Sequence, residues 1–334
     1  MHYIIKSLIC AAVAGTCFFL ANGCSKKSDA PSAPIGGGAT AAKARRIGIS
    51  IPSADHGWTG GVVWWAERAK AELTAANPGL AIEIVTAKDS TEQVNQIETL
   101  LSKGIDALVV LPHEPGPLTN VCASVKESGA LLVVVDRGLT RAVADIEVVG
   151  DNPGFGRVCG EQLAKVLGGQ GAVVVMEGVP CQVNTDRVEA FKAVMANYPD
   201  IQVLDSQPAN WDTAQGLKVM EAFLQKYPKI DAVWTGDDDV LLGALKAYEE
   251  SGRSDVKCFI GGGGNKLINK KVLDYDPLIP VNVTYPPKMI YVGVEEAIAV
   301  LNGATDGLPK KVVVPADVIT PENAAEFYYP DSIY

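Results

Sequence analysis

The first loop with chemically versatile side chains follows the β-branched run 47–51 and contains Asp55, His56 and Trp58. A helical pattern begins just after it, beyond Gly60, so the order is strand, loop, helix. In an open α/β sheet, ligands bind in the crevice beyond the carboxyl ends of the strands. The loop therefore offers an aromatic face and several hydrogen-bonding groups where a ligand pocket is expected.

A second polar pair, Asp136 and Arg137, comes directly after the fully apolar run 131–135. A carboxylate can accept from two neighbouring hydroxyls, and a planar guanidinium can donate to two adjacent oxygens.

Trp211 lies in a later loop, so each half of the chain contributes a tryptophan, with Trp58 as the other. Paired aromatic planes can sandwich the apolar faces of a pyranose while polar groups surround its edge. These residue types therefore suit a sugar.

Three consecutive carboxylates, Asp237–Asp239, follow the apolar run 232–234. They could ligate a metal, cap a helix or accept from hydroxyl groups. The glycine run Gly168–Gly171 is not a dinucleotide fingerprint, because it precedes a strand and does not link a strand to a helix. The run Gly261–Gly264 is not a phosphate loop, because no Ser or Thr follows Lys266.

Strand-length apolar runs alternate with segments of helical period along the chain. The predicted strands are 47–51, 81–85, 107–111, 131–135, 172–176, 201–204, 232–234, 258–260 and 281–283. Near-continuously apolar strands imply parallel sheets that are covered by helices on both faces. Nine strand-helix units are many for a single sheet in a chain of this length. The pattern therefore predicts an α/β protein with two Rossmann-like lobes, divided near Gly150 to Pro153.

Two helices illustrate these predictions. Ser90 and Gln93 have the spacing of a capping box, the apolar positions of 94–101 share one face, and Gly104 ends the helix. In the helix after the first loop, Trp65 belongs to an apolar stripe and is expected in the core.

Composition limits the function classes. With 334 residues and 48% hydrophobic content, the chain can bury a sizeable core, and its length suggests about two domains. A formal net charge of -10 argues against nucleic acid, whose binding needs Lys and Arg to neutralise phosphates.

The beginning of the chain is typical of an exported protein. Residues 1–23 are predicted to be a signal peptide, since the apolar run 8–20 is short for a membrane span of about 20 residues. The sequence Leu-Ala-Asn-Gly-Cys that ends at Cys24 resembles a bacterial lipoprotein box, which predicts a lipid on Cys24. Cleavage without lipid is the alternative. Residues 24–44 are rich in Ser, Ala, Pro and Gly and are predicted to be a flexible tether.

The remaining cysteines are scattered, without the Cys-x-x-Cys spacing of a zinc or redox site. Export permits disulfides, but we expect small buried residues at these positions. They are Cys122, Cys159, Cys181 and Cys258.

Five motifs occur in an order that carries a family resemblance. They are Ile-Gly-Ile-Ser-Ile-Pro at 47–52, Val-Val-Val-Asp-Arg at 133–137, Asn-Thr-Asp-Arg at 184–187, Ser-Gln-Pro-Ala-Asn-Trp-Asp at 206–212 and Gly-Asp-Asp-Asp at 236–239. Together they resemble the ribose-binding-like family of periplasmic sugar-binding proteins, which deliver monosaccharides to ABC importers. The resemblance covers the chain after the export segment.

The resemblance implies the type I periplasmic binding fold, with two lobes joined by a hinge of three crossings. The first lobe would comprise residues 45–150 and 285–312. The second would comprise residues 151–284 and 313–334.

The resemblance also implies which side chains contact the sugar. Besides Asp136 and Arg137, these are His113, Asn184, Arg187, Trp211, Asp237 and Tyr285, with Glu114 beside them. Asp239 is expected to begin the following helix. Many relatives carry an aspartate where this chain has Gly261–Gly264, so one usual hydroxyl acceptor is absent.

The predicted function is that of a non-enzymatic receptor whose lobes close on a pentose, hexose or related cyclitol and deliver it to a membrane permease. We expect a monomeric periplasmic or cell-envelope lipoprotein without metal, cofactor or nucleic acid. Presentation of the sugar to a sensor or chemoreceptor is compatible with this function. One alternative is a glycosyltransferase that holds a metal on Asp237–Asp239. Another is a regulator of the lactose-repressor type, which would need a DNA-binding headpiece where the signal peptide and tether are predicted.

Overall fold

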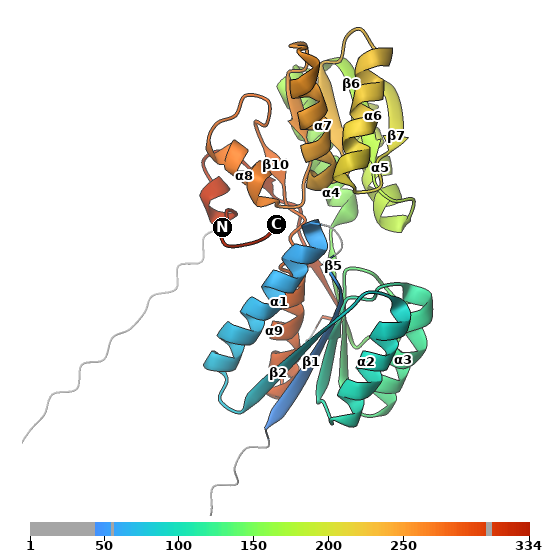
Figure 1. Ribbon diagram of the computed structural model, residues 1–334, viewed down its shortest axis with the longest axis vertical. Helices are drawn as coiled ribbons and strands as arrows, with labels where there is room; N and C mark the ends of the chain where they lie inside the picture. Colours follow the sequence, from blue (N-terminus) through green and yellow to red (C-terminus); the bar gives the residue numbers. More distant parts are fainter. Residues whose placement is uncertain (1–43, 55–56, 305–308) are drawn as a thin grey trace, which may run out of the picture. The chain divides into compact units, whose positions relative to one another are not determined.

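The computed structural model describes residues 44–54, 57–304 and 309–334 (Figure 1). The predicted signal peptide, Cys24 and the tether up to residue 43 lie outside the described residues. So do Asp55 and His56. Within the described residues, the first strand begins at Arg45, and the chain then alternates between strands and helices.

Six parallel strands form the first sheet, in the order β11-β5-β4-β3-β1-β2. Their bounds are β1 (Arg45–Pro52), β2 (Leu80–Ala87), β3 (Ala107–Val110), β4 (Leu131–Val135), β5 (Ile146–Gly150) and β11 (Lys311–Val314). Figure 1 shows α1 (Gly57–Ala76) and α9 (Met289–Leu301) on one face and α2 (Ser90–Ser102) and α3 (Pro115–Glu127) on the other.

Successive residues of these strands face opposite layers, as the pleat of a strand requires. Ile47 and Ile49 pack into the cluster that contains the buried residues of α1 and α9. Leu108 and Val110 pack into the cluster formed with α2 and α3. Trp65 belongs to the first cluster and is 6% exposed, which confirms its prediction as a core residue.

Four parallel strands form the second sheet, in the order β7-β6-β8-β9. Their bounds are β6 (Gln170–Glu177), β7 (Asp200–Pro208), β8 (Ala232–Thr235) and β9 (Cys258–Ile260). The helices pair as α4 (Asn152–Leu167) with α5 (Gln182–Met195), and as α6 (Thr213–Lys226) with α7 (Asp238–Ser251). The first pair shares a core with Val173 and Val175, and the second with Val174 and Met176, so both faces are covered.

The chain passes between the two sheets after β5, after β10 (Asn282–Val283) and after β11. β10 pairs in antiparallel fashion with β12 (Val318–Ile319). The helix α8 (Lys266–Leu273) precedes β10, and the short 3-10 helix η1 (Ala324–Glu326) follows β12. The predicted α/β fold with a hinge of three crossings is confirmed. β11 continues to Val314, beyond the predicted limit at residue 312, and neither β11 nor β12 was among the predicted strands.

The predicted capping box at the start of α2 is wrong. Asp89 caps this helix, and its carboxylate accepts from the Glu92 N–H at 2.8 Å. The Gln93 amide points into the core, where Nε2 donates to the Leu111 carbonyl at 2.9 Å. Gly104, at a φ of 71°, follows the end of the helix as predicted. A local sequence pattern could not show that the Gln93 side chain makes tertiary contacts in the core and does not cap the helix.

The cysteines largely follow their prediction. Cys122, Cys159 and Cys258 are buried and free, and burial raises the pKa of each thiol to about 12. Cys181 is free but exposed, so the expectation of burial is wrong for it. It is the N-cap residue of α5, so it comes directly before the first residue of the helix.

Candidate ligand site

Three segments that are distant in the sequence meet at Tyr285, which follows β10 and is 5% exposed. Its hydroxyl donates to Asp136 Oδ1 at 2.5 Å, and its backbone carbonyl accepts from Trp58 Nε1 at 2.9 Å. Burial, and then the Asp136 carboxylate, raises the pKa of the Tyr285 hydroxyl, which therefore remains a donor. The fold thus brings together three residues that were predicted to share a ligand site.

Trp58 is placed differently from its prediction as a loop residue. It lies in the first turn of α1, is 8% exposed, and its ring centre is 5.9 Å from that of Tyr285. Because the indole N–H is bonded to a backbone carbonyl, the side chain is held in place before any ligand arrives.

Asp136 and Arg137 follow β4 as predicted, and Asp136 has a left-handed φ of 59°. Asp136 Oδ2 is 3.9 Å from Arg137 Nε, and the guanidinium donates to the His113 carbonyl at 2.9 Å. The His113 N–H in turn donates to Gln93 Oε1 at 2.7 Å. Gln93 was not predicted as a site residue, yet it fixes the loop that Arg137 contacts. His113 is half-buried, whereas Glu114 is exposed.

Arg187 lies in α5, is 4% exposed, and has its guanidinium between two aromatic rings. Its Cζ is 4.4 Å from the Phe155 ring centre and 4.1 Å from the Tyr285 ring centre. Nε donates to Asn152 Oδ1 at 2.9 Å, and Nη1 donates to the Gly236 carbonyl at 2.7 Å. A guanidinium can both stack on rings and donate in its plane, so Arg187 connects α5 to the Tyr285 segment.

Phe155, which was not predicted as a site residue, accounts for the glycine at position 262. A Cβ built on Gly262 would lie 2.2 Å from Phe155 Cε2 and 2.5 Å from the Val283 carbonyl oxygen. A side chain at this position is therefore incompatible with the Phe155 ring. The signal in the sequence was the glycine itself, because a glycine at a strand end often marks a close approach.

Two members of the acidic triplet contact backbone groups at the starts of helices. Asp237 caps α7, since its Oδ1 accepts from the Val240 N–H at 3.0 Å. Asp239, which was expected to begin the helix, lies in its first turn and is 6% exposed. Hydrogen bonds from the backbones of Trp58 and Gly57 lower its pKa against the stronger effect of burial. Asp239 therefore faces the first turn of α1.

All three carboxyls of the triplet are buried, and burial is the largest cause that raises each pKa. The pKa of Asp238 is raised to about 7, although its Oδ2 accepts from Asn265 N at 2.8 Å and from Asn282 Nδ2 at 3.0 Å. That of Asp239 is raised to about 6, and that of Asp237 is raised well above its usual value. Across 44–54, 57–304 and 309–334, no group of three or more His, Cys, Asp or Glu side chains is arranged to hold a metal ion.

Asn184 and Trp211 meet at Gly178, in the loop after β6. Asn184 Oδ1 accepts from the Gly178 N–H at 2.7 Å, and its Nδ2 donates to Glu177 Oε2 at 3.2 Å. A Cβ on Gly178 would lie 2.0 Å from Trp211 Nε1, so the indole packs directly against this backbone. Within the described part of the chain, Trp211 Nε1 is buried without a hydrogen-bond partner. Asn184 thus supports the loop, and Trp211 keeps a free donor.

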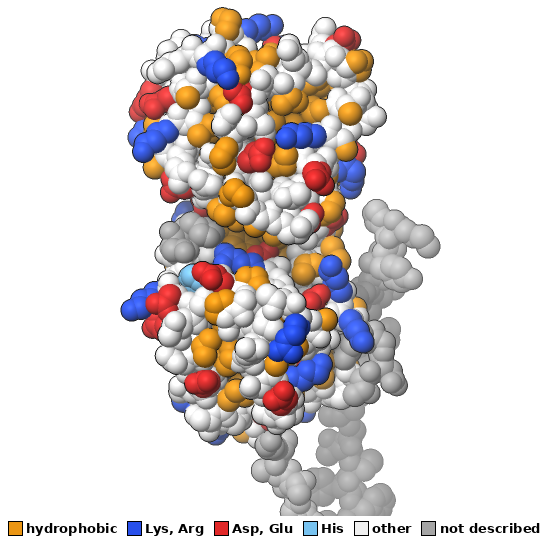
Figure 2. Space-filling model, turned by 90° about the vertical axis from the view of Figure 1, so that its right-hand side faces the viewer, with side chains coloured by type: hydrophobic (Ala, Val, Ile, Leu, Met, Phe, Trp, Pro, Cys, Tyr) orange, Lys and Arg blue, Asp and Glu red, His pale blue; other side chains and the backbone are white. Residues whose placement is uncertain are grey.

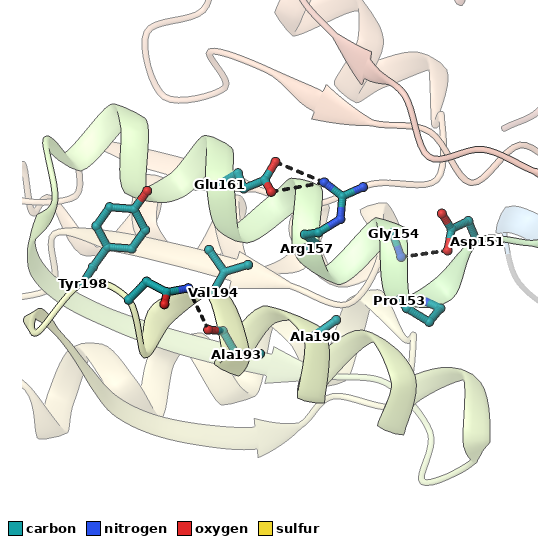
Figure 3. Close-up of a pocket in the computed structure, with 10 residues that line it drawn as sticks. Asp151, Pro153, Gly154, Arg157, Glu161, Ala190, Ala193, Val194 and Tyr198 are labelled. Atoms are coloured by element: carbon teal, nitrogen blue, oxygen red, sulfur yellow. Dashed lines mark hydrogen bonds and ion pairs between the residues drawn. The ribbon is translucent and has the colours of Figure 1, made fainter.

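A hollow of about 590 Å³ lies elsewhere, between α4 and α5 (Figure 3). Its wall includes Ala190, Val194 and Tyr198, together with Arg157 and Glu161. The two charged side chains pair with each other at 3.1 Å. None of the predicted site residues that the structure describes lines this hollow.

On the face shown in Figure 2, basic and acidic side chains are interspersed. Such a surface does not resemble the basic stripe of a nucleic-acid-binding protein, in agreement with the net charge of -10. None of the helices described in the structure is long and apolar enough to cross a membrane.

Residues 47–305 match the family model of the periplasmic binding protein domain. The chain therefore belongs to the periplasmic binding protein family, and its relatives place it with the ribose-binding-like proteins.

Curated relatives are similar over much of the chain. A ribose import binding protein from Bacillus subtilis is 32% identical over 197 residues, which cover 58% of this chain and 63% of the relative. A xylitol-binding protein from Mycolicibacterium smegmatis is 31% identical over 228 residues, covering 66% of this chain and 63% of the relative. The chain thus spans just under two thirds of these relatives. A D-apiose import binding protein from Paraburkholderia graminis is 26% identical over 291 residues, covering 86% of this chain and 91% of the relative.

Solved structures share the fold. A solute-binding protein of an ABC transporter from Bacillus halodurans, with bound myo-inositol, has a TM-score of 0.73 at 24% identity and covers 87% of this chain and 99% of its own. The fructose-binding periplasmic domain of a hybrid two-component system has a TM-score of 0.71 at 26% identity and covers 84% of this chain and 92% of its own.

Proposed function

We propose that this protein is the substrate-binding lipoprotein of an ABC importer, which binds one monosaccharide or cyclitol between two closing lobes and presents it to a permease. The observation that carries the proposal is the convergence of Trp58, Asp136 and Arg187 on Tyr285 in a member of the periplasmic binding protein family. The relatives named above are import or binding proteins for ribose, xylitol and D-apiose.

The chemistry of the site favours an uncharged ligand that is rich in hydroxyls. Aromatic rings can cover its C–H faces, while carboxylates accept from its hydroxyls and guanidinium groups donate to its oxygens. Asp136 and Arg137 would act from the first lobe, and Arg187, Trp211 and Asp237 from the second. Closure would be driven by contacts that the ligand makes with both lobes in the closed form alone.

The lobes would follow the boundaries given by the resemblance, 45–150 with 285–312 and 151–284 with 313–334. The first set contains most of the six-stranded sheet, and the second contains the four-stranded sheet. Three short connections between them suit a hinge, because only a few backbone angles need to change.

The glycosyltransferase alternative is less favoured by the site. Asp237 is engaged as the cap of α7, and Asp238 accepts from the Gly264 and Asn265 N–H groups. Carboxylates that already accept from the backbone are poorly placed to ligate a divalent cation together. We therefore propose a receptor that does not transform its ligand.

The test is calorimetry with D-ribose, xylitol, D-apiose and myo-inositol, with and without EDTA, followed by analysis of the recovered ligand. We expect one of these compounds to bind with one-to-one stoichiometry, to be unaffected by chelation and to be recovered unchanged. Loss of binding in EDTA, or conversion of the ligand, would favour the enzyme instead.

The anchoring through Cys24 is tested separately by Cys24→Ser and cell fractionation. We expect the parent protein in the membrane fraction and the variant in the soluble fraction, because the variant has no thiol to carry a lipid. Equal membrane association and normal processing of both would show that the lipid assignment is wrong.

A further inference from the structure

The segment that follows η1, residues 329–334, packs against α1. The Tyr329 ring centre is 5.0 Å from that of Trp65, at an interplanar angle of 82°, and 5.9 Å from that of Trp64. The Arg68 guanidinium carbon lies 5.8 Å from the Tyr329 ring centre. Edge-on aromatic contacts and a cation over a ring are both attractive, so the segment is attached to a helix that covers the six-stranded sheet.

The same part of the chain is also attached to α8. Lys266 donates to the Ser332 carbonyl, and just before the segment Asn269 Nδ2 donates to the Phe327 carbonyl at 2.9 Å. Through Ile268, α8 belongs to the core cluster of the four-stranded sheet. The segment therefore links elements of both sheets by noncovalent contacts, in addition to the three covalent connections.

Tyr334 is 3% exposed and lies between the two groups of elements. A Cβ on Gly57 would lie 2.8 Å from Tyr334 Cδ2, and a Cβ on Gly61 would lie 3.1 Å from Tyr334 Cβ. On the other side, a Cβ on Gly263 would lie 2.2 Å from Tyr334 Oη. The glycines at the start of α1 and in the loop after β9 thus leave room for this ring, which fills the space between them.

The ring also lies beside the acidic triplet. A Cβ on Gly263 would meet both Tyr334 Oη and Asp238 Oδ2, the latter at 3.4 Å. A Cβ on Gly57 would meet both Tyr334 and Asp239 Oδ1, the latter at 2.5 Å. Among the described residues, the Tyr334 hydroxyl has no hydrogen-bond partner, so apolar packing is what holds the ring.

We propose that Tyr334 is a positioning residue of the ligand site: its ring holds the first turn of α1, which carries Trp58, against Asp238 and Asp239. This inference rests on the proposed function. Trp58 donates to the Tyr285 carbonyl, and the Tyr285 hydroxyl donates to Asp136. A displacement of the first turn of α1 would therefore disturb the contacts among these three residues. A ligand held by both lobes would then dissociate faster.

The test compares Tyr334→Ala with Tyr334→Phe, and uses Tyr275→Ala as a matched control because Tyr275 is 68% exposed. In stopped-flow measurements with whichever of D-ribose, xylitol, D-apiose and myo-inositol binds in calorimetry, we expect Tyr334→Ala to raise the dissociation rate about 10-fold, since losses of interface packing act mainly on dissociation. Tyr334→Phe should restore the parent rate, because the ring is kept and only an unpartnered hydroxyl is lost. The control should dissociate like the parent.

Amide hydrogen exchange without ligand provides the second readout. We expect Tyr334→Ala to speed exchange in residues 57–64 more than in the strands of either sheet. Unchanged exchange there, uniformly faster exchange throughout the chain, or failure of Tyr334→Phe to restore the parent behaviour would overturn the proposal. Because exchange needs no ligand, it also separates failure of this inference from failure of sugar binding.

Discussion

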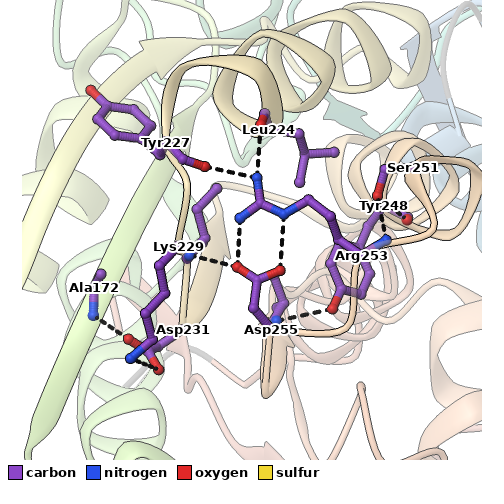
Figure 4. Close-up of polar contacts among 11 residues, drawn as sticks. Ala172, Leu224, Tyr227, Lys229, Asp231, Tyr248, Ser251, Arg253 and Asp255 are labelled. Atoms are coloured by element: carbon purple, nitrogen blue, oxygen red, sulfur yellow. Dashed lines mark hydrogen bonds and ion pairs between the residues drawn. The ribbon is translucent and has the colours of Figure 1, made fainter.

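In the four-stranded sheet, the amino ends of the strands form one edge (the amino edge) and the carboxyl ends form the other (the carboxyl edge). The aspartates at these two edges have pKa values shifted in opposite directions. At the amino edge, Asp255 is bound by Arg253 at 2.5 Å, and this hydrogen bond is the main cause that lowers its pKa (Figure 4). Burial acts to raise the pKa of Asp231, but the Ala172 N–H and Lys257 outweigh it, so the pKa is lowered. Each carboxylate at this edge is thus stabilised in its charged form.

At the carboxyl edge, Asp237, Asp238 and Asp239 follow β8 and have raised pKa values. Burial is the largest cause for each, and the Arg187 guanidinium offsets it only in part at Asp237. A buried carboxylate without a paired cation is costly to the fold. The same residue type therefore serves as scaffold at one edge and as a candidate site at the other.

The comparison between the two edges favours the proposed ligand site at the carboxyl edge. Charges that only support the fold are neutralised by fixed partners, as at Asp255. Under the proposed function, the groups of the ligand site are incompletely compensated until the ligand binds. Trp211, with a buried N–H that lacks a partner among the described residues, fits the second description.

The largest effect on stability is expected from Arg253→Ala. This arginine donates to Asp255 and also to the Leu224 and Tyr227 carbonyls, both at 2.7 Å. Removing it should lower the free energy of unfolding by about 3 kcal/mol, because several partners lose their donor together. Urea denaturation measures this loss. Ligand affinity in the same variant should equal that of the parent. A loss of affinity would contradict the assignment of Arg253 to the scaffold alone.

Arg187→Ala should act mainly on binding. A hydrogen bond that involves a charged group contributes about 1.5 to 3 kcal/mol, which corresponds to roughly 10-fold to 150-fold weaker affinity. Because Arg187 is buried between two rings, ligand-free stability should fall as well. The matched control is Arg157→Ala, an arginine of α4 that is 55% exposed in its side chain and pairs with Glu161. If Arg187→Ala binds the ligand as the parent does in calorimetry, this arginine belongs to the scaffold.

The sharpest contrast between the two edges is expected in the pH dependence of stability. The folded pKa of Asp238 is raised to about 7, so the folded state holds its proton more tightly than the unfolded chain does. The resulting stabilisation is complete below the unfolded pKa of about 4 and is lost as pH rises to about 7. Asp238→Asn should therefore show a smaller decrease in melting temperature between pH 5 and pH 8 than the parent does.

Asp255→Asn is the control at the other edge. Its folded pKa is lowered, so its stabilisation is present above the unfolded pKa of about 4 and is lost only as pH falls below that value. This variant should be less stable than the parent at both pH 5 and pH 8, by a similar amount. Identical pH profiles for Asp238→Asn and the parent would contradict the assignment of a proton to the carboxyl edge.

Local patterns in the sequence were sufficient to predict most of the strands and the helices between them, although β11 and β12 were missed. Apolar runs such as 131–135 must be buried on both faces, and a helical stripe such as that of Trp65 must face a sheet. These are properties of neighbouring residues, so they do not depend on the rest of the fold. For the same reason, the sequence placed Asp136 and Arg137 correctly at a strand end.

Only the tertiary structure decided which of these side chains meet, because the contacts join residues separated by 227 positions in the case of Trp58 and Tyr285. No periodicity encodes that Phe155 fills the space at Gly262 or that Gln93 supports the His113 loop. The loops that form the carboxyl edge could be predicted, because their positions depend only on where each strand ends. The burial that raises the pKa values of the Asp237–Asp239 carboxyls, and the Tyr334 ring that packs beside them, depend on contacts between segments far apart in the sequence.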